Sequence, residues 1–216
     1  MKKTILLLVM SAFLSGAYCQ DENYTMIMVQ HIKSFGMAQT PDDFQNLANT
    51  FERISNAESD QWPPLYYTAF SYVNLSFVSK TNEDKDSYLD KAQTYLDKAF
   101  EIYPDESELY ALQGLLHEGR IQIDPVGRGR IYSMKANEAL EKAKQYNPEN
   151  PRTYYLMGLN ILHTPEAFGG GAEPACKLFQ TAIEKYKTYT PLNVLLPTWG
   201  AERNNQLFTE NCTNEN

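Results

Sequence analysis

The residue types that most often carry catalysis are few and scattered in this chain. Its three histidines, His31, His117 and His163, lie far apart, and no two of them have the spacing of metal ligands. No serine or cysteine stands in a recognisable nucleophile arrangement beside any of them. The sequence therefore predicts a protein that is not an enzyme, needs no metal or cofactor, and acts by binding.

One glycine-rich stretch offers backbone amides to an anion. It precedes Pro174, whose ring suits the first turn of a helix, and amides at a helix N-terminus can hold a phosphate or carboxylate. The alternative is a tight turn between two packed helices, because glycine tolerates positive φ. The turn is favoured, since no Lys-Ser or Lys-Thr follows as in a nucleotide-binding loop. The glycines concerned are Gly169, Gly170 and Gly171.

A second anion candidate is a local basic cluster of Arg120, Arg128 and Arg130 in or beside a loop expected at residues 119–130. Guanidinium forks suit carboxylates and phosphates. Acidic residues are abundant nearby, so the alternative is that these arginines form ordinary ion pairs.

The N-terminus has the three parts of a secretory signal peptide. Lys2 and Lys3 precede an apolar run at residues 4–14, which is too short to span a membrane, and small residues follow. Cleavage after Ala17 competes with cleavage after Cys19, the second being preferred, and a third interpretation keeps Cys19 as a lipidated first residue. The sequence predicts an exported protein without a membrane span, periplasmic or secreted, and the short signal favours a bacterial source.

Removal of the signal leaves an acidic chain with two cysteines. The formal charge changes from −8 to −10, which repels phosphate backbones, so nucleic acid is not expected as a partner. Cys176 and Cys212 could form a disulfide in an oxidising compartment and so pin the C-terminal tail to the last helix pair. Two free thiols are the alternative.

Helical periodicity and proline boundaries divide the 216 residues into repeated helix pairs. Equivalent landmarks recur at one interval: Gly158 follows Gly114 by 44 residues, and Pro148 follows Pro104 by 44. Such a period predicts a stacked array of helix pairs. The expected division is a signal peptide at 1–19, a degenerate pair at 20–61, three pairs at 62–104, 105–148 and 149–190, and a C-terminal cap and tail at 191–216.

These pairs resemble the tetratricopeptide repeat (TPR) family. A large residue, a glycine four later, then Ala, a large residue, Ala and Pro make up the family's pattern. It is met by Tyr110, Gly114, Ala136, Leu140, Ala143 and Pro148, and again, without the proline, by Tyr154, Gly158, Ala175, Phe179 and Ala182. The resemblance implies an all-α, right-handed solenoid. Gly114 and Ala136 are 22 residues apart, more than the family pattern allows, so the helices or the loop between them must be longer.

The first helices of successive repeats line the concave face in the resembled family, and equivalent positions here are aromatic and apolar. Such a surface suits an extended peptide, a helix or an apolar ligand. The alternative is that the same stripe packs against a neighbouring helix or the cap. The predicted groove residues are Tyr66, Phe70, Asn74, Glu108, Leu115, Arg152, Tyr155, Leu159 and His163.

Three functions follow from this pattern, in order of preference. The first is an assembly module or scaffold that holds a protein or peptide segment in the groove, with Arg152 and Glu108 setting its orientation. The second is a small-ligand-binding accessory component of an envelope solute transporter. The third is an enzyme acting on a phosphorylated substrate, which would require the arginine and glycine loops to converge on an acid or histidine.

Overall fold

The computed structural model describes residues 22–213. The predicted signal peptide with its two cleavage points and Cys19, as well as residues 214–216, lie outside this part. Every regular element in residues 22–213 is helical. The chain runs through a helix at 22–34, α2 (Pro41–Ala57), α3 (Trp62–Val78), α4 (Asn82–Ile102), α5 (Ser107–Ile123), α6 (Pro125–Tyr146), α7 (Pro151–His163), the short 3-10 helix η1 (Glu166–Phe168), α8 (Ala172–Thr188) and α9 (Ala201–Cys212).

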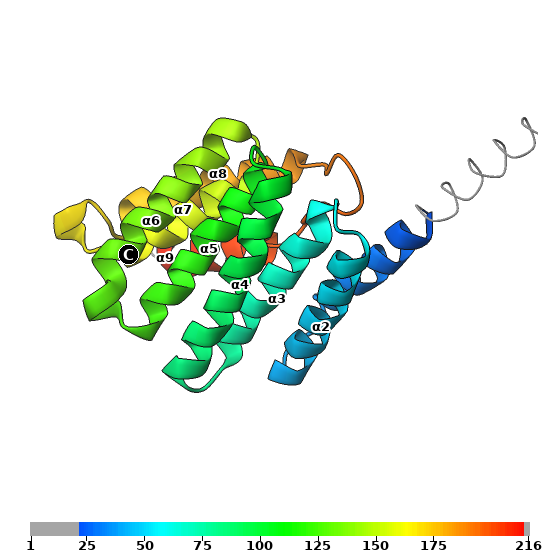
Figure 1. Ribbon diagram of the computed structural model, residues 1–216. Coiled ribbons are helices and arrows are strands. Elements are labelled where there is room, and N and C mark those ends of the chain that lie inside the picture. The colour runs from blue at the N-terminus through cyan, green and yellow to red at the C-terminus, as the bar shows by residue number, and fades with distance from the viewer. Residues whose placement is uncertain (1–21, 214–216) are drawn as a thin grey trace, which may run out of the picture.

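The helices pack as consecutive antiparallel pairs, in chain order across the molecule (Figure 1). α3 packs on α4, α5 on α6 and α7 on α8, while α3, α5 and α7 also contact one another in succession. These three first helices form an inner layer, and α4, α6 and α8 form an outer one. The predicted all-α solenoid of TPR-like helix pairs is confirmed.

Small residues hold each pair together at the predicted close-packing positions. A Cβ added to Gly114 would lie 2.7 Å from the side chain of Leu140, and one added to Gly158 would lie 2.6 Å from the ring of Phe179. Both distances are too short for a real contact. Leu140 and Phe179 are themselves completely buried, so each glycine lets a large partner fill the space between two helices.

The extra length of the pair formed by α5 and α6 lies in its helices and not in a loop. α5 ends at Ile123 and α6 begins at Pro125, so Asp124 alone separates them. The expected loop at residues 119–130 is therefore wrong, because Asp124 caps α6: its Oδ1 accepts a hydrogen bond from the Gly127 amide at 3.0 Å. A Cβ on Gly127 would collide with that carboxylate, so glycine here permits the cap and does not mark a loop.

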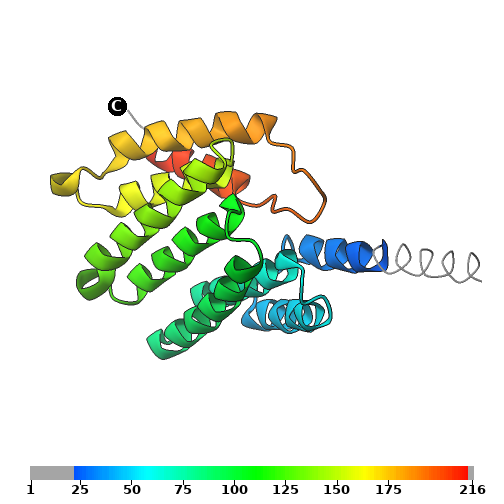
Figure 2. The ribbon, with the colours of Figure 1, turned by 45° about the horizontal axis from the view of Figure 1, so that its top comes forward.

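The C-terminal part of the chain folds back over the solenoid. After α8, residues 189–200 run without regular secondary structure, loop out toward the N-terminal helices and return to α9, which packs on α8 (Figure 2). Cys176 and Cys212 form a disulfide between these two helices, and Asn204 Nδ2 donates to the Phe179 carbonyl at 3.1 Å. Residues 189–200 are called the covering segment below. None of the described helices is long and apolar enough to cross a membrane.

Candidate functional site

The predicted groove residues lie on the inner layer, and most of them are buried. Asn74 and Leu159 are half-buried, and His163 is exposed at the end of α7. The remaining six form a continuous stripe of buried side chains across α3, α5 and α7: Tyr66, Phe70, Glu108, Leu115, Arg152 and Tyr155. The stripe is therefore not an open trough in this structure, and the physical reason is the segment that covers it.

The side chain of Trp199 in the covering segment lies in the middle of this stripe. Its indole ring stacks on Phe70 with the ring centres 4.9 Å apart and the planes 15° from parallel. Tyr155 meets the indole edge-on at 6.4 Å, and the indole Nε1 donates to Tyr66 Oη at 2.8 Å. Phe70, Tyr66 and Tyr155 thus form an aromatic slot that the chain fills with its own tryptophan.

Scaffold side chains also bind the backbone of the covering segment. Tyr67 Oη on α3 donates to the Leu195 carbonyl at 3.0 Å. Arg152 on α7 and Tyr186 on α8 donate to the Trp199 carbonyl, at 3.3 Å and 3.1 Å. Donors from three helices therefore converge on carbonyl oxygens of one segment.

Arg152 and Glu108 form an ion pair beneath the segment, called the covered pair below. Arg152 Nε and Nη2 donate to the two carboxylate oxygens of Glu108 at 2.7 and 2.5 Å, and the arginine side chain is 0% exposed. Burial alone would lower the pKa of Arg152, but the Glu108 carboxylate outweighs it and raises that pKa above its ordinary value. The Arg152 guanidinium also lies 4.6 Å from the Tyr189 ring, so the charge is enclosed on several sides.

The phenols around the slot stay protonated. Burial, followed by the nearby Glu108 charge, raises the pKa of Tyr66 and that of Tyr67, while burial raises the pKa of Tyr155 to about 12. A neutral phenol keeps its proton for hydrogen bonding. The rim of the slot therefore carries hydroxyl donors and one guanidinium.

Glu118 is a second buried carboxyl on α5, ten residues after Glu108. It is 4% exposed, and its Oε1 has no hydrogen-bond partner within the described part of the chain. Burial raises the pKa of Glu118 to about 7. Sequence periodicity gave no sign of this residue, because a lone glutamate on a helix is normally solvated.

The arginines of the predicted anion site are in helices, and two of them are already paired. Arg128 donates to both oxygens of Asp86 at 2.7 Å, and Arg120 binds the same carboxylate at 2.6 Å and also Asp90. Arg130 is exposed on α6. The four paired residues Arg120, Arg128, Asp86 and Asp90, called the rim cluster below, neutralise one another and leave no free fork for an anion.

The glycine-rich stretch is a tight turn whose amides are used internally. Gly169 and Gly171 have φ of 81° and 102°, and the amides of Gly169, Gly170 and Gly171 donate to backbone carbonyls at 2.9, 3.2 and 3.0 Å. A Cβ on Gly170 would lie 1.9 Å from the Thr164 carbonyl oxygen. These amides therefore do not point at an anion, and the turn has the structural role that was the alternative expectation.

The histidines and carboxylates do not gather anywhere in residues 22–213. No group of three or more His, Cys, Asp or Glu side chains within that range could hold a metal ion. His117 is half-buried beside Tyr132, and this burial lowers its pKa to about 4, so it is neutral at physiological pH. Its Nδ1 has no partner among the described residues.

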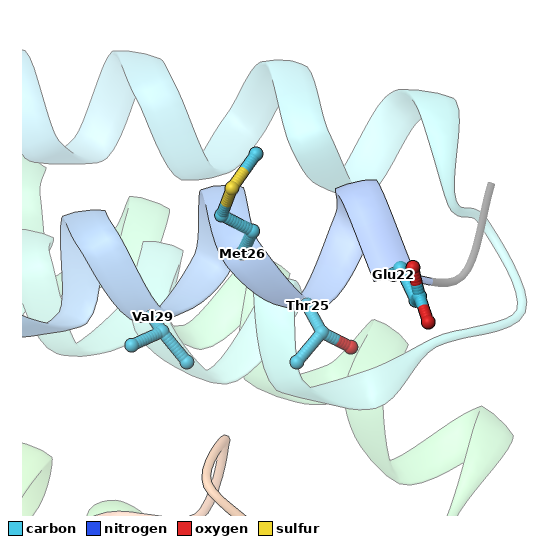
Figure 3. Close-up of a pocket in the computed structure, with 4 residues that line it drawn as sticks. All are labelled: Glu22, Thr25, Met26 and Val29. Carbon is cyan, nitrogen blue, oxygen red and sulfur yellow. The ribbon is translucent and has the colours of Figure 1, made fainter. Parts of the chain in front are cut away.

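A hollow of about 370 Å³ lies against the helix at 22–34. It is lined by Glu22, Thr25, Met26 and Val29, and Figure 3 shows Thr25 and Val29 on one side of the helix and Met26 on the other. Met26 is 63% exposed. The two polar residues that line it among residues 22–213 are the exposed Glu22 and the half-buried Thr25, so the described lining lacks the buried polar groups of a built site.

Sequence reasoning missed Trp199 as a site residue. The tail was expected to cap the end of the stack, and α9 does pack on α8, but the covering segment reaches back to α3, where Trp199 meets Tyr66 and Phe70. The available signal was an aromatic residue between Pro197 and Gly200 in a stretch with no helical period. Such a stretch has to find its partners by tertiary packing, which periodicity does not reveal.

Comparison with solved structures places this fold beside two known proteins. No protein-family model matches the sequence, and no curated protein sequence does either. The HusA haemophore from Porphyromonas gingivalis superposes with a TM-score of 0.81 at 27% identity, over 89% of this chain and 94% of the haemophore. A thermophilic TPR protein from Thermus thermophilus superposes with a TM-score of 0.57 at 16% identity, over 90% of this chain and 92% of that one. Both superpositions extend over nearly the whole of both chains, but the second, at 16% identity, shows the fold alone, whereas the first has the higher TM-score and the higher identity.

Proposed function

We propose that the protein is an exported, non-enzymatic carrier of an apolar, flat small molecule of the tetrapyrrole class, such as haem. The observation that carries this proposal is the near-complete superposition on a haemophore. Of the three functions that the sequence suggested, small-ligand binding therefore takes precedence over peptide binding. The rim cluster and the glycine turn bind within the chain, so the enzyme hypothesis has no convergent site.

A peptide is the less favoured occupant of the inner stripe for a physical reason. An extended peptide would need the inner stripe, but Trp199 and the carbonyls of the covering segment already use its aromatic rings and hydrogen-bond donors. Any occupant has to replace these contacts, and a flat ring system matches the shape of the Trp199 indole better than an extended peptide does. A partner protein could still bind elsewhere on the surface.

Export is supported by two separate features. The basic and apolar start of the sequence has the form of a signal peptide, and Cys176 and Cys212 form a disulfide, which persists in oxidising compartments. A carrier outside the cytoplasm would meet its ligand there and pass it to a receptor or transporter in the envelope.

The test is a titration of hemin into the purified chain from Gln20 to Asn216, followed by the absorbance of the Soret band. The expected result is saturation at one hemin per chain, with a spectrum distinct from that of free hemin. The same protein unfolded in denaturant serves as the control for non-specific uptake. Absorbance that rises in proportion to added hemin without saturation, or that is equal in the unfolded control, would contradict the proposal.

A further inference from the structure

The aromatic slot holds Trp199 in the way that a protein holds a flat ligand. One ring face stacks on Phe70, an edge meets Tyr155, and the only polar atom of the indole donates to Tyr66. Stacking, edge contact and one fixed hydrogen bond are the elements of aromatic recognition. The slot therefore already has the geometry for a planar ring system.

The hydrogen-bond donors around the slot determine which polar groups a ligand in the slot must have. Tyr67, Arg152 and Tyr186 each give a hydrogen to a carbonyl oxygen of the covering segment. If that segment left, these three donors would lose their acceptors, and a ligand that covered them without accepting their hydrogen bonds would leave them unsatisfied at a cost in free energy. A replacement ligand must bring oxygen acceptors of its own, and carboxylates meet this need best beside a guanidinium.

The covering segment is built so that it can leave without unfolding α9. It has no regular secondary structure, and its middle is poorly held, with Leu192 95% exposed and Val194 64% exposed. The Cys176–Cys212 disulfide and the bond from Asn204 to Phe179 keep α9 on α8 independently of the segment. Segments with few buried contacts open at low free-energy cost.

We propose that the aromatic slot is the ligand site, and that a planar aromatic ligand bearing carboxylates enters it by displacing the Trp199 indole. The ring system takes the place of the indole over Phe70, and the ligand carboxylates accept the hydrogen bonds that Tyr67, Arg152 and Tyr186 now give to the segment. This inference rests on the proposed function, because it assigns the site and the displaced group to a tetrapyrrole with carboxylate side chains.

The first test compares protoporphyrin IX binding to the wild-type chain and to Trp199→Ala. Removing the competing indole is expected to tighten binding about tenfold, because the open form no longer has to be reached against that contact. Leu192→Ala is the matched control, since it shortens an exposed side chain of the same segment outside the slot, and its affinity should equal that of the wild type. Binding to Trp199→Ala that is equal to or weaker than wild-type binding overturns the slot assignment.

The second test uses the wild-type chain and so does not depend on a variant folding. Hydrogen exchange is measured with and without protoporphyrin IX, comparing residues 189–200 with α9. Exchange in the covering segment should rise several-fold on binding while α9 stays protected, because the segment is expelled and α9 remains anchored. A segment that becomes more protected, or does not change, overturns the displacement.

The third test addresses the carboxylates. The dimethyl ester of protoporphyrin IX keeps the ring and loses both negative charges, so it should bind about tenfold more weakly than the free acid. Equal affinities of the ester and the free acid would show that Tyr67, Arg152 and Tyr186 do not bind the ligand carboxylates. Absence of saturable binding in the wild type and in Trp199→Ala alike overturns the proposed function itself, whereas wild-type binding that Trp199→Ala fails to tighten overturns the slot alone.

Discussion

The covered pair and the rim cluster use the same arginine and carboxylate chemistry in opposite surroundings. Arg152 and Glu108 are almost completely buried, with side chains 0% and 5% exposed. In the rim cluster Asp86 is 30% exposed, and its partner Arg128 is 33% exposed. Water solvates the charges of the rim cluster and is excluded from the covered pair. Similar N–O distances therefore go with very different losses of stability when one partner is removed.

This difference in burial identifies the covered pair as the ion pair that supports the candidate site. Removing one member of a buried pair leaves an uncompensated charge, whereas removing one member of an exposed pair leaves a charge that water solvates. The covered pair also supports the slot, since Arg152 donates to the Trp199 carbonyl. The rim cluster only joins α4 to α5 and α6.

The largest expected effect is at the covered pair. Arg152→Leu should lower the free energy of unfolding by about 3–5 kcal/mol, because Glu108 would stay buried without a counter-ion. Urea denaturation at pH 7 measures the change. The double variant Arg152→Leu, Glu108→Leu is the control and should recover much of the loss. A single variant as stable as the wild type would contradict this account of the pair.

The disulfide that holds α9 on α8 gives the next effect. Cys176→Ser with Cys212→Ser should lower the free energy of unfolding by about 4 kcal/mol, because the bond closes a loop of 36 residues in the unfolded chain. The stability of wild type and variant is compared by urea denaturation without reductant, and the wild type in reductant should match the variant. A variant as stable as the oxidised wild type would show that the disulfide adds nothing to the anchoring of α9.

Glu118 adds a third case to the comparison of the covered pair with the rim cluster: a buried carboxyl whose Oε1 has no hydrogen-bond partner in the described part of the chain. Its folded pKa of about 7 lies above the ordinary 4.5, so the folded chain holds this proton more tightly than the unfolded chain. The contribution to stability is therefore complete below pH 4.5 and is lost as the pH rises through about 7. Glu118→Gln should remove this slope and raise the free energy of unfolding at pH 8 by up to about 3 kcal/mol.

The measurement for Glu118 is urea denaturation of both proteins at pH 4 and pH 8. The two should be equally stable at pH 4, where both side chains are neutral, and should diverge at pH 8. Parallel pH profiles would show that Glu118 is ionised without cost. Glu141→Gln, on α6, is a control for the chemical change at a half-buried position.

The smallest effect is expected at the rim cluster. Arg128→Ala should lower the free energy of unfolding by less than about 1 kcal/mol, because Asp86 keeps Arg120 and contact with water. The loss should shrink further at 0.5 M NaCl, since salt screens exposed charges. Arg130→Ala, an exposed arginine of the same helix, serves as the control. A loss as large as that of Arg152→Leu would remove the contrast between the two regions.

The fold could be predicted from sequence because its determinants are local or periodic. Gly114 and Gly158 mark the close helix contacts, and Pro151 begins α7. The same reasoning predicted a loop at residues 119–130, which is wrong, because Gly127 lies in the first turn of α6 and donates its amide hydrogen to the capping carboxylate of Asp124. A residue pattern alone does not separate a glycine that ends a helix from one that makes room for a capping carboxylate.

The candidate site could be predicted only in part. Tyr66, Phe70, Arg152 and Tyr155 were found because equivalent positions of repeats share a face. Their cover was not found, because Trp199 lies 133 residues from Tyr66 and belongs to a segment with no period. The partner of Arg152 is 44 residues away, at one repeat's distance, but only the structure shows the two side chains in contact.

The return of the covering segment to α3 also has a consequence for how the chain folds. A solenoid normally gains stability from neighbouring repeats, so folding can begin at any repeat and spread along the array. Here Trp199 bonds Tyr66 across the whole array, and this contact can form only after every intervening helix pair is in place. While the segment is in place it ties the first inner helix to the tail, and a ligand that displaces it should leave the helix pairs to unfold less cooperatively.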